Sequence, residues 1–195
     1  MTTTVARLIF NSIVPEKLRS DIPDDQPIGS QELKNVLQRV AEEQPEQYKD
    51  ISFKLMRLGS KGAVETGSSF SMQDLESPID KKKLLDEVSQ KENDIFSNSK
   101  LTQENKEDLL VKMYDKYSSK MPDLIFNASM KKGSNLAKMV ASGARGNKSQ
   151  LNSNIGADFL VTDQFNRPVP IGIKSSYTEG MSPAEYFAAS YGTRA

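Results

Sequence analysis

One short stretch of the sequence carries residue types that suit contact with a phosphate group. Residues 142–150 read SGARGNKSQ, so that Gly143 and Gly146 lie on either side of Arg145, and Lys148 follows three residues later. Glycine allows a close approach to exposed backbone N–H groups, and the arginine guanidinium is a planar fork that matches phosphate oxygens. The pattern indicates a polyphosphate contact. A flexible turn with a solvent-facing arginine is the plainer alternative, since neither a Walker loop nor a dinucleotide-binding glycine motif is present.

The composition excludes several other kinds of chemistry. The chain has 195 residues with no Cys and no His, which removes disulfides, thiolate zinc sites, catalytic triads and histidine metal ligands. Lys and Arg number 26, as do Asp and Glu, which argues against binding of nucleic acid through bulk positive charge. Hydrophobic residues make up 36% of the chain. This is enough for a core of its own, and it would also suit a chain that completes the burial of its apolar residues against a partner.

No apolar run approaches the roughly 18 residues that a membrane span needs, and the N-terminus lacks a signal-peptide pattern. We therefore expect a soluble cytoplasmic chain with no membrane partner, in the host cytoplasm if the source is viral.

The elements that would position the phosphate-contact stretch are mainly helical. Residues 5–14 form an apolar run that fits a buried strand or a helical turn, and residues 20–30 are typical of a loop. Ser30 is expected to cap a helix that ends near Pro45, and a second helix is expected over 48–64.

Farther along the chain, residues 79–121 predict an antiparallel helical hairpin with a polar turn and Thr102 as a cap. Residues 133–157 are rich in Gly, Ser and Asn, and residues 158–174 are β-prone around a turn at 164–167. Ser182 and Pro183 begin another helix. The predicted fold class is mainly α with a small β-containing region near 158–174.

Four blocks of the sequence resemble the largest catalytic subunit (β′) of multisubunit DNA-directed RNA polymerases. The blocks occur in that family's order and at compatible spacings over nearly the whole chain. They are TTVARLIFN with Pro15 (3–15), GSSFSMQDL (67–75), MVASGARGNKSQ (139–150), and EGM, EYF and SYGTR within 179–194.

The resemblance implies a fragment of a larger subunit with three parts. Residues 1–29 would continue from an upstream pore region, and residues 30–132 would form funnel helices with the hairpin 79–121 on the channel rim. Residues 133–195 would form a channel loop and the start of the bridge helix. The family's NADFDGD aspartates and its trigger loop are absent from this sequence.

Departures from the family pattern are typical of a phage or another divergent source. The family usually has Gly at the position of Ala6, Arg at Asp158, Pro at Gly172 and His at Tyr191.

The resemblance also implies roles for individual residues. Arg145 would contact the triphosphate of an incoming nucleotide, with Lys148 as a weaker candidate that is more typical of a solvated charge. The loop itself would be supported by Gly143, Gly146, Asn147 and Gln150. No catalytic residue and no metal ligand is expected in this chain, and Mg²⁺ in the assembled polymerase would be held elsewhere.

The implied partners are the remaining β′ parts, a β-like subunit, DNA template, RNA and nucleoside triphosphates. Two alternatives stay open. One is a detached β′-like module that binds a host polymerase or its channel-binding regulators without catalysis, and the other is a non-functional truncation product.

Other residues have plainer interpretations. Tyr186 and Phe187 are predicted to be core residues, the run Lys81–Lys83 is predicted to be a solvated helix surface, and Asp158 and Asp163 are not expected to bind metal.

Overall fold

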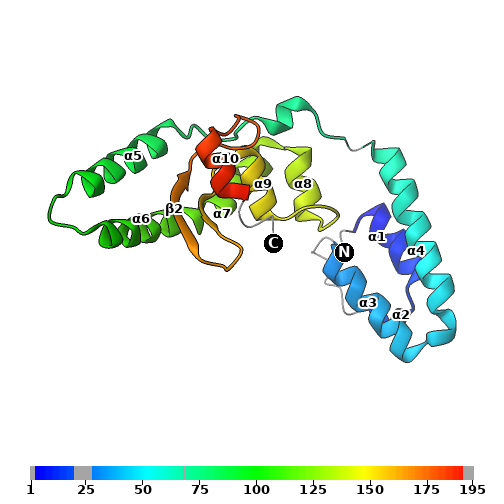
Figure 1. Cartoon of the computed structure of the whole chain (residues 1–195). Helices are drawn as coiled ribbons and strands as arrows, with labels where there is room; N and C mark the ends of the chain where they lie inside the picture. Colours follow the sequence, from blue (N-terminus) through cyan, green and yellow to red (C-terminus); the bar gives the residue numbers. More distant parts are fainter. Residues whose placement is uncertain (1–2, 20–27, 68, 191–195) are drawn as a thin grey trace. The chain divides into compact units, whose positions relative to one another are not determined.

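The computed structural model describes residues 3–19, 28–67 and 69–190, which form two compact units. The N-terminal unit contains the residues up to 69 together with 141–145. The hairpin unit contains 70–140 and the described residues from 146 onward. Figure 1 colours both units along the chain. The central part of the predicted loop at 20–30, and Tyr191 with the residues after it, lie outside the described residues.

The N-terminal unit consists of α1 (Val5–Ile13), α2 (Glu16–Arg19), α3 (Ser30–Glu43) and α4 (Pro45–Thr66). The apolar run 5–14 is therefore a helix, and its first turn is capped by Thr4, whose hydroxyl accepts from the Arg7 N–H at 3.3 Å. Both α1 and α3 pack against α4. Their shared core contains Phe10, Val14, Leu18, Val36, Val40, Ile51 and Leu55.

The start of α3 differs by one residue from the sequence prediction. Ser30 is the first helical residue and Gly29 holds the cap position. The Glu32 carboxylate accepts from the Gly29 N–H at 2.9 Å, so this acidic side chain satisfies a backbone donor ahead of the helix. The prediction that Pro45 ends the first helix is confirmed, because α3 stops at Glu43 and Pro45 opens α4.

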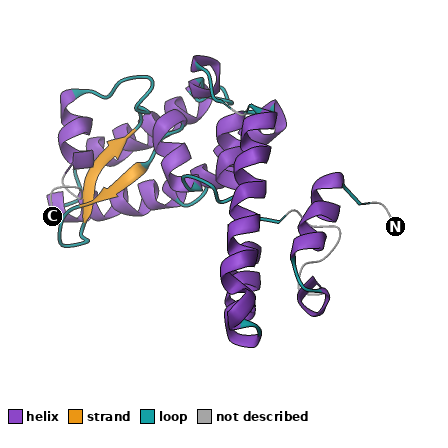
Figure 2. Ribbon diagram, turned by 90° about the vertical axis from the view of Figure 1, so that its right-hand side faces the viewer, coloured by secondary structure: helices purple, strands orange, loops and turns teal. Residues whose placement is uncertain are grey.

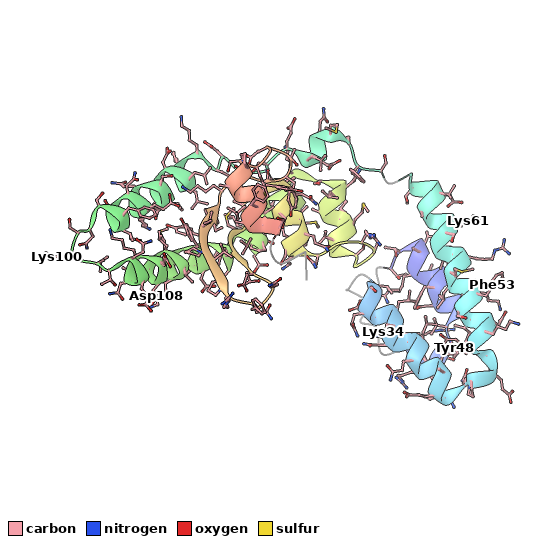
Figure 3. The ribbon with its side chains drawn as sticks, in the orientation of Figure 1. Lys34, Tyr48, Phe53, Lys61, Lys100 and Asp108 are labelled. Atoms are coloured by element: carbon pink, nitrogen blue, oxygen red, sulfur yellow. The ribbon has the colours of Figure 1, made fainter. Side chains whose placement is uncertain are left out.

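The predicted helical hairpin is confirmed. Its arms are α5 (Lys82–Ser97) and α6 (Gln103–Ser118), which pack on each other, with Lys100 in the turn between them (Figures 1 and 3). The Thr102 hydroxyl caps α6 by accepting from the Asn105 N–H at 3.4 Å. The second arm ends at Ser118 and not at Met121, because Met121 begins the next helix and Pro122 fits in its first turn.

The rest of the hairpin unit surrounds a small sheet, whose two strands lie side by side among helices in Figure 2. Strands β1 (Phe159–Thr162) and β2 (Pro168–Ile173) pair antiparallel, so the predicted β region and its turn are confirmed. Both strands pack against α6 and α10. The accompanying helices are the 3₁₀ helix η1 (Met72–Leu75), α7 (Met121–Lys132), α8 (Asn135–Ala141), α9 (Lys148–Ile155) and α10 (Pro183–Ser190).

The core of this unit joins α5, α6, α7 and α9 to the start of β1. Its fully buried side chains include Val88, Ile125, Leu151, Ile155 and Phe159. Among the residues that the structure describes, none of the helices is both long and apolar enough to cross a membrane.

The prediction that Tyr186 and Phe187 are core residues is wrong. Tyr186 is 58% exposed and Phe187 is 57% exposed, whereas Ala188 is 1% exposed. The helix α10 packs closely on β2, and a small side chain is what lets the two backbones approach. The two aromatic rings contact each other edge to face on the outer side of the helix.

Candidate functional site

The candidate phosphate-contact stretch is a loop between two helices. It begins after α8, which ends at Ala141, and it ends at Asn147, the cap of α9. Gly143 has φ +71° and Gly146 has φ +79°, a left-handed conformation that residues with a side chain rarely adopt. At Gly143 there is a second restriction, because an added Cβ would lie 2.9 Å from the Ser30 Cβ. The two glycines therefore determine the shape of the loop.

Arg145 lies between these glycines with an exposed side chain. Within the ranges 3–19, 28–67 and 69–190, no hydrogen bond or ion pair engages its guanidinium. An arginine in this condition keeps all five N–H donors available to a ligand, and two of them can bind a phosphate at once.

Lys148, the weaker candidate, is held by α7. Its Nζ lies 2.6 Å from Asp123 Oδ1 and 4.8 Å from the centre of the Phe126 ring. The side chain is 49% exposed, so this is a surface ion pair with an added cation–π contact. A ligand would have to compete with Asp123 for this ammonium group, whereas Arg145 has no such competitor among the described residues.

Asn147 and Gln150 bond to each other across the first turn of α9. The Gln150 N–H donates to Asn147 Oδ1 at 2.8 Å, and the Asn147 N–H donates to Gln150 Oε1 at 3.1 Å. This reciprocal pair is a capping box, which satisfies two backbone donors that a helix start leaves open. It fixes the end of the loop that follows Arg145.

The two aspartates near β1 have separate structural partners. Asp158 accepts from Asn152 Nδ2 at 2.9 Å and from Ser153 Oγ at 3.0 Å. Asp163 closes the turn of the β-hairpin by accepting from the backbone N–H of Arg167 at 2.9 Å. Within the described part of the chain, acidic side chains do not gather in threes as a metal site would need.

Comparison of the sequence with known proteins shows what the chain is similar to. No protein-family model matches the chain. A protein of Streptomyces avermitilis is 29% identical over 202 residues, an alignment that covers 100% of this chain and 15% of that protein. A protein of Dehalococcoides mccartyi is 29% identical over 198 residues with the same coverage, and one of Thermoanaerobacter pseudethanolicus is 26% identical over 206 residues. All three are named DNA-directed RNA polymerase subunit beta′.

The chain is thus similar over its full length to polymerase β′ subunits. The resemblance read from the sequence is thereby confirmed over the full length, and the chain spans about 15% of the length of the first two relatives. The roles of Arg145, Lys148 and the residues around them stay predictions.

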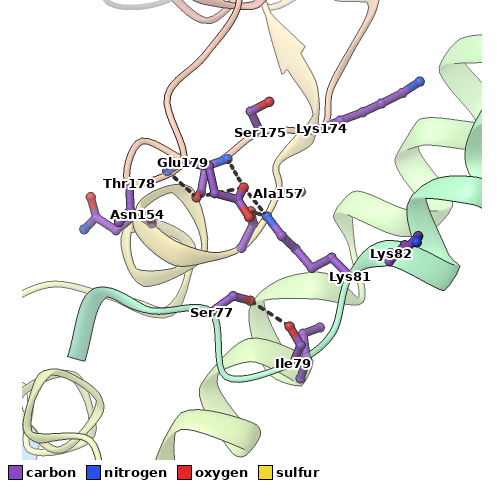
Figure 4. A network of polar contacts seen from close by, with 12 residues as sticks. Ser77, Ile79, Lys81, Lys82, Asn154, Ala157, Lys174, Ser175, Thr178 and Glu179 are labelled. Carbon is purple, nitrogen blue, oxygen red and sulfur yellow. Dashed lines mark hydrogen bonds and ion pairs between the residues drawn. The ribbon is translucent and has the colours of Figure 1, made fainter. Parts of the chain in front are cut away.

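One buried polar arrangement of this chain is not predictable from the sequence. Lys81 is predicted to be solvated, but its side chain is only 5% exposed. Figure 4 shows it reaching toward Glu179. Its Nζ donates to the Gly156 carbonyl at 2.7 Å and to the Glu179 carboxylate at 2.5 Å. Burial raises the pKa of Glu179, but hydrogen bonds from Lys81 and the Ser176 N–H outweigh it, so the net pKa lies below the usual value. The prediction fails because Glu179 is 98 positions away along the chain.

Proposed function

We propose that this chain forms part of a β′-like subunit of a DNA-directed RNA polymerase. It lines the entry channel for nucleotides and supports the active centre during transcription. The observation that carries the proposal is Arg145, an exposed arginine without a partner among the described residues, in a glycine-shaped loop of a chain that is similar to β′ over its full length.

In this proposal Arg145 holds the triphosphate of the incoming nucleotide for a short time. The guanidinium donates two parallel N–H bonds to phosphate oxygens, and the left-handed turns at Gly143 and Gly146 set the course of the backbone on either side of it. The capping box of Asn147 and Gln150 keeps the end of the loop in place when the phosphates bind. Magnesium, held by residues outside this chain, would supply the Lewis-acid chemistry of nucleotidyl transfer.

The surface of the N-terminal unit supports assembly with other polymerase parts. On α1, Phe10 is buried while Val5 is 74% exposed and Leu8 is 57% exposed, so the helix also presents apolar side chains on its outer face. Apolar side chains exposed side by side on one helix are typical of a surface that a partner covers. The proposed partners are the remaining β′ parts and a β-like subunit, with DNA and RNA bound by the assembled enzyme.

The test is the dependence of elongation on nucleotide concentration, measured with the assembled polymerase on a preformed template and RNA scaffold. Arg145→Ala should weaken apparent nucleotide affinity by about one to two orders of magnitude, since a charge-assisted hydrogen bond contributes about 1.5–3 kcal/mol. Arg145→Lys should restore part of the loss, because lysine keeps the charge but not the fork.

Two controls make the result specific. Lys148→Ala should have a smaller effect, and Arg57→Ala, which removes an arginine that lies over the Phe53 ring on α4, should have none. If Arg145→Ala leaves the nucleotide dependence unchanged while the enzyme assembles normally, the proposed contact is wrong. The purified chain alone should make no RNA from template and nucleotides, and template-dependent synthesis by it would contradict its role as one part of an enzyme.

A further inference from the structure

The segment that leads from β2 into α10 is held to α5, the first arm of the helical hairpin, and to the residue before it, at two points. The first point is Lys81, directly before α5. Its buried ammonium group bridges Gly156, which follows α9, and Glu179, which precedes α10 (Figure 4). A lysine this deeply buried needs a carboxylate partner, so the two segments are held together at the base of the hairpin.

The second point lies farther along α5. Lys174, directly after β2, donates to the Glu92 carboxylate and to Ser89 Oγ, the latter at 3.2 Å. The side chains of this ion pair are 29% and 12% exposed, so water screens it less than a surface pair. Glu92 also accepts from Tyr114 Oη on α6 at 2.6 Å. One carboxylate on α5 therefore joins the other hairpin arm and the end of β2.

The segment between these points and α10 is itself rigidly bonded. The Glu185 carboxylate, in the first turn of α10, accepts from the backbone N–H groups of Lys174, Ser175 and Ser182 at 2.9, 3.1 and 2.9 Å. The Glu179 carboxylate accepts from the Ser176 N–H at 3.0 Å. A displacement of Lys174 is thus passed through Glu185 to the start of α10.

We propose that the pairs Lys81–Glu179 and Lys174–Glu92 act as a two-point strap that makes the α5–α6 hairpin and α10 move as one body. With the strap intact, a partner that displaces the hairpin turn also displaces α10. With the strap broken, α6 stays packed on the sheet, while α5 and the turn around Lys100 move independently of α10. This coupling is a property of the hairpin unit and does not depend on the polymerase assignment.

The coupling can be measured by the distance between two spin labels on the full chain. The sequence has no cysteine, so Lys100→Cys in the hairpin turn and Ala184→Cys on α10, both exposed positions, give the only two labelling sites. Pulsed electron–electron double resonance should give a narrow distribution of distances between the two labels in the parent chain. Lys174→Met or Glu92→Gln should at least double its width and speed amide exchange in 174–180 about tenfold.

The exchanged pair Lys174→Glu with Glu92→Lys should restore the narrow distribution, which a loss of packing alone would not allow. Lys83→Met is the matched control for Lys174→Met, because it removes the same charge from an exposed position of α5 and should change nothing. If Lys174→Met does not fold, the milder Glu92→Gln decides, since it keeps the volume and an acceptor oxygen for Tyr114. Unchanged width and exchange in Glu92→Gln, in a folded chain, would overturn the strap.

Discussion

The two units bury their apolar residues in different ways. The N-terminal unit has a core of aliphatic residues and Phe10, yet it also exposes large apolar side chains on the outer faces of its helices. On α4, Phe53, Met56 and Val64 are 52%, 60% and 81% exposed, and Figure 3 shows Phe53 on the side of α4 that faces away from α1. The hairpin unit encloses a mixed core of helices and strands, although it too exposes large apolar side chains such as Met72 at 78% and Phe165 at 65%.

The side-chain hydrogen bonds of the two units also differ in how far apart along the sequence their partners lie. In the N-terminal unit, side-chain bonds such as Arg19 Nε to the Val14 carbonyl, at 2.9 Å, link near neighbours in the sequence. In the hairpin unit, the Lys81 bonds to Gly156 and Glu179 join residues 75 and 98 positions apart. Long-range polar contacts such as these hold the hairpin unit together from within, whereas the N-terminal unit is held chiefly by its apolar core.

The largest expected effect comes from breaking a helix of the hairpin unit. Val88 is fully buried in the middle of α5, and a proline there removes a backbone hydrogen bond and clashes with the preceding turn. Val88→Pro should lower the free energy of unfolding of this unit by about 3 kcal/mol or more. Urea unfolding followed by hydrogen-exchange mass spectrometry should show this loss in the hairpin unit, with amide protection in α1, α3 and α4 unchanged.

Val88→Ala is the comparison variant, because it removes packing but keeps the backbone bond, and it should cost less than Val88→Pro. If protection in the N-terminal unit falls together with that of the hairpin unit, the two do not unfold separately and the contrast between them fails.

An intermediate effect is expected at the exposed apolar face of α1. Leu8→Asp should change the stability of the chain by less than about 0.5 kcal/mol, since the side chain is already in water. It should weaken association with the proposed polymerase partners about tenfold, because a carboxylate would be buried in an apolar contact. Titration of labelled chain with the remaining purified parts measures the association constant.

Gln47→Asp adds the same charge at an exposed polar position of α4 and should leave association unchanged. Equal association constants for Leu8→Asp and the parent chain would show that α1 is not an interface, and the apolar surface of this unit would then have no partner.

Local sequence signals predicted most of the elements. The helical spacing on both arms predicted the hairpin, and Thr102 and Ser182 were identified as caps from residue type alone. The turn between the strands followed from its composition, and Asp163 holds it by accepting from the Phe165 N–H at 2.8 Å. These features depend on residues within a few positions of each other, which is why one sequence is enough to find them.

Features that depend on distant partners were not predictable. The run Lys81–Lys83 has the appearance of a solvated surface, and only the folded chain shows that Lys81 lies beside Glu179. The same holds for Lys148, whose pairing with Asp123 requires α7 to pack on α9. The resemblance to β′ identified the loop around Arg145, and the positive φ angles at Gly143 and Gly146 agree with what glycine permits.

The smallest expected effect concerns two aspartates of the hairpin unit that lie at opposite ends of β1. Burial raises the pKa of Asp158, and hydrogen bonds from Ser153 and Asn152 offset this only in part. The pKa of Asp163 is lowered, chiefly by the hydrogen bond from the Arg167 backbone, which outweighs the opposing effect of burial. The two carboxylates should therefore contribute to the pH dependence of stability with opposite signs.

For Asp158 the folded chain binds the proton more tightly than the unfolded chain does, so its contribution falls as pH rises from the unfolded pKa, about 3.9, through the higher folded value. Asp158→Asn keeps an acceptor oxygen without the buried charge and should raise the melting temperature at pH 7, with the difference shrinking below about pH 4.

For Asp163 the folded pKa is the lower one, so its contribution is present above the unfolded pKa and is lost as pH falls through the folded value. Asp163→Asn should therefore lower the melting temperature at pH 7. Calorimetry of both variants across this range checks the signs. A loss of stability at pH 7 in Asp158→Asn as well would mean that the ionised form of Asp158 is the one its neighbours favour, and that polar contacts in the hairpin unit outweigh burial even there.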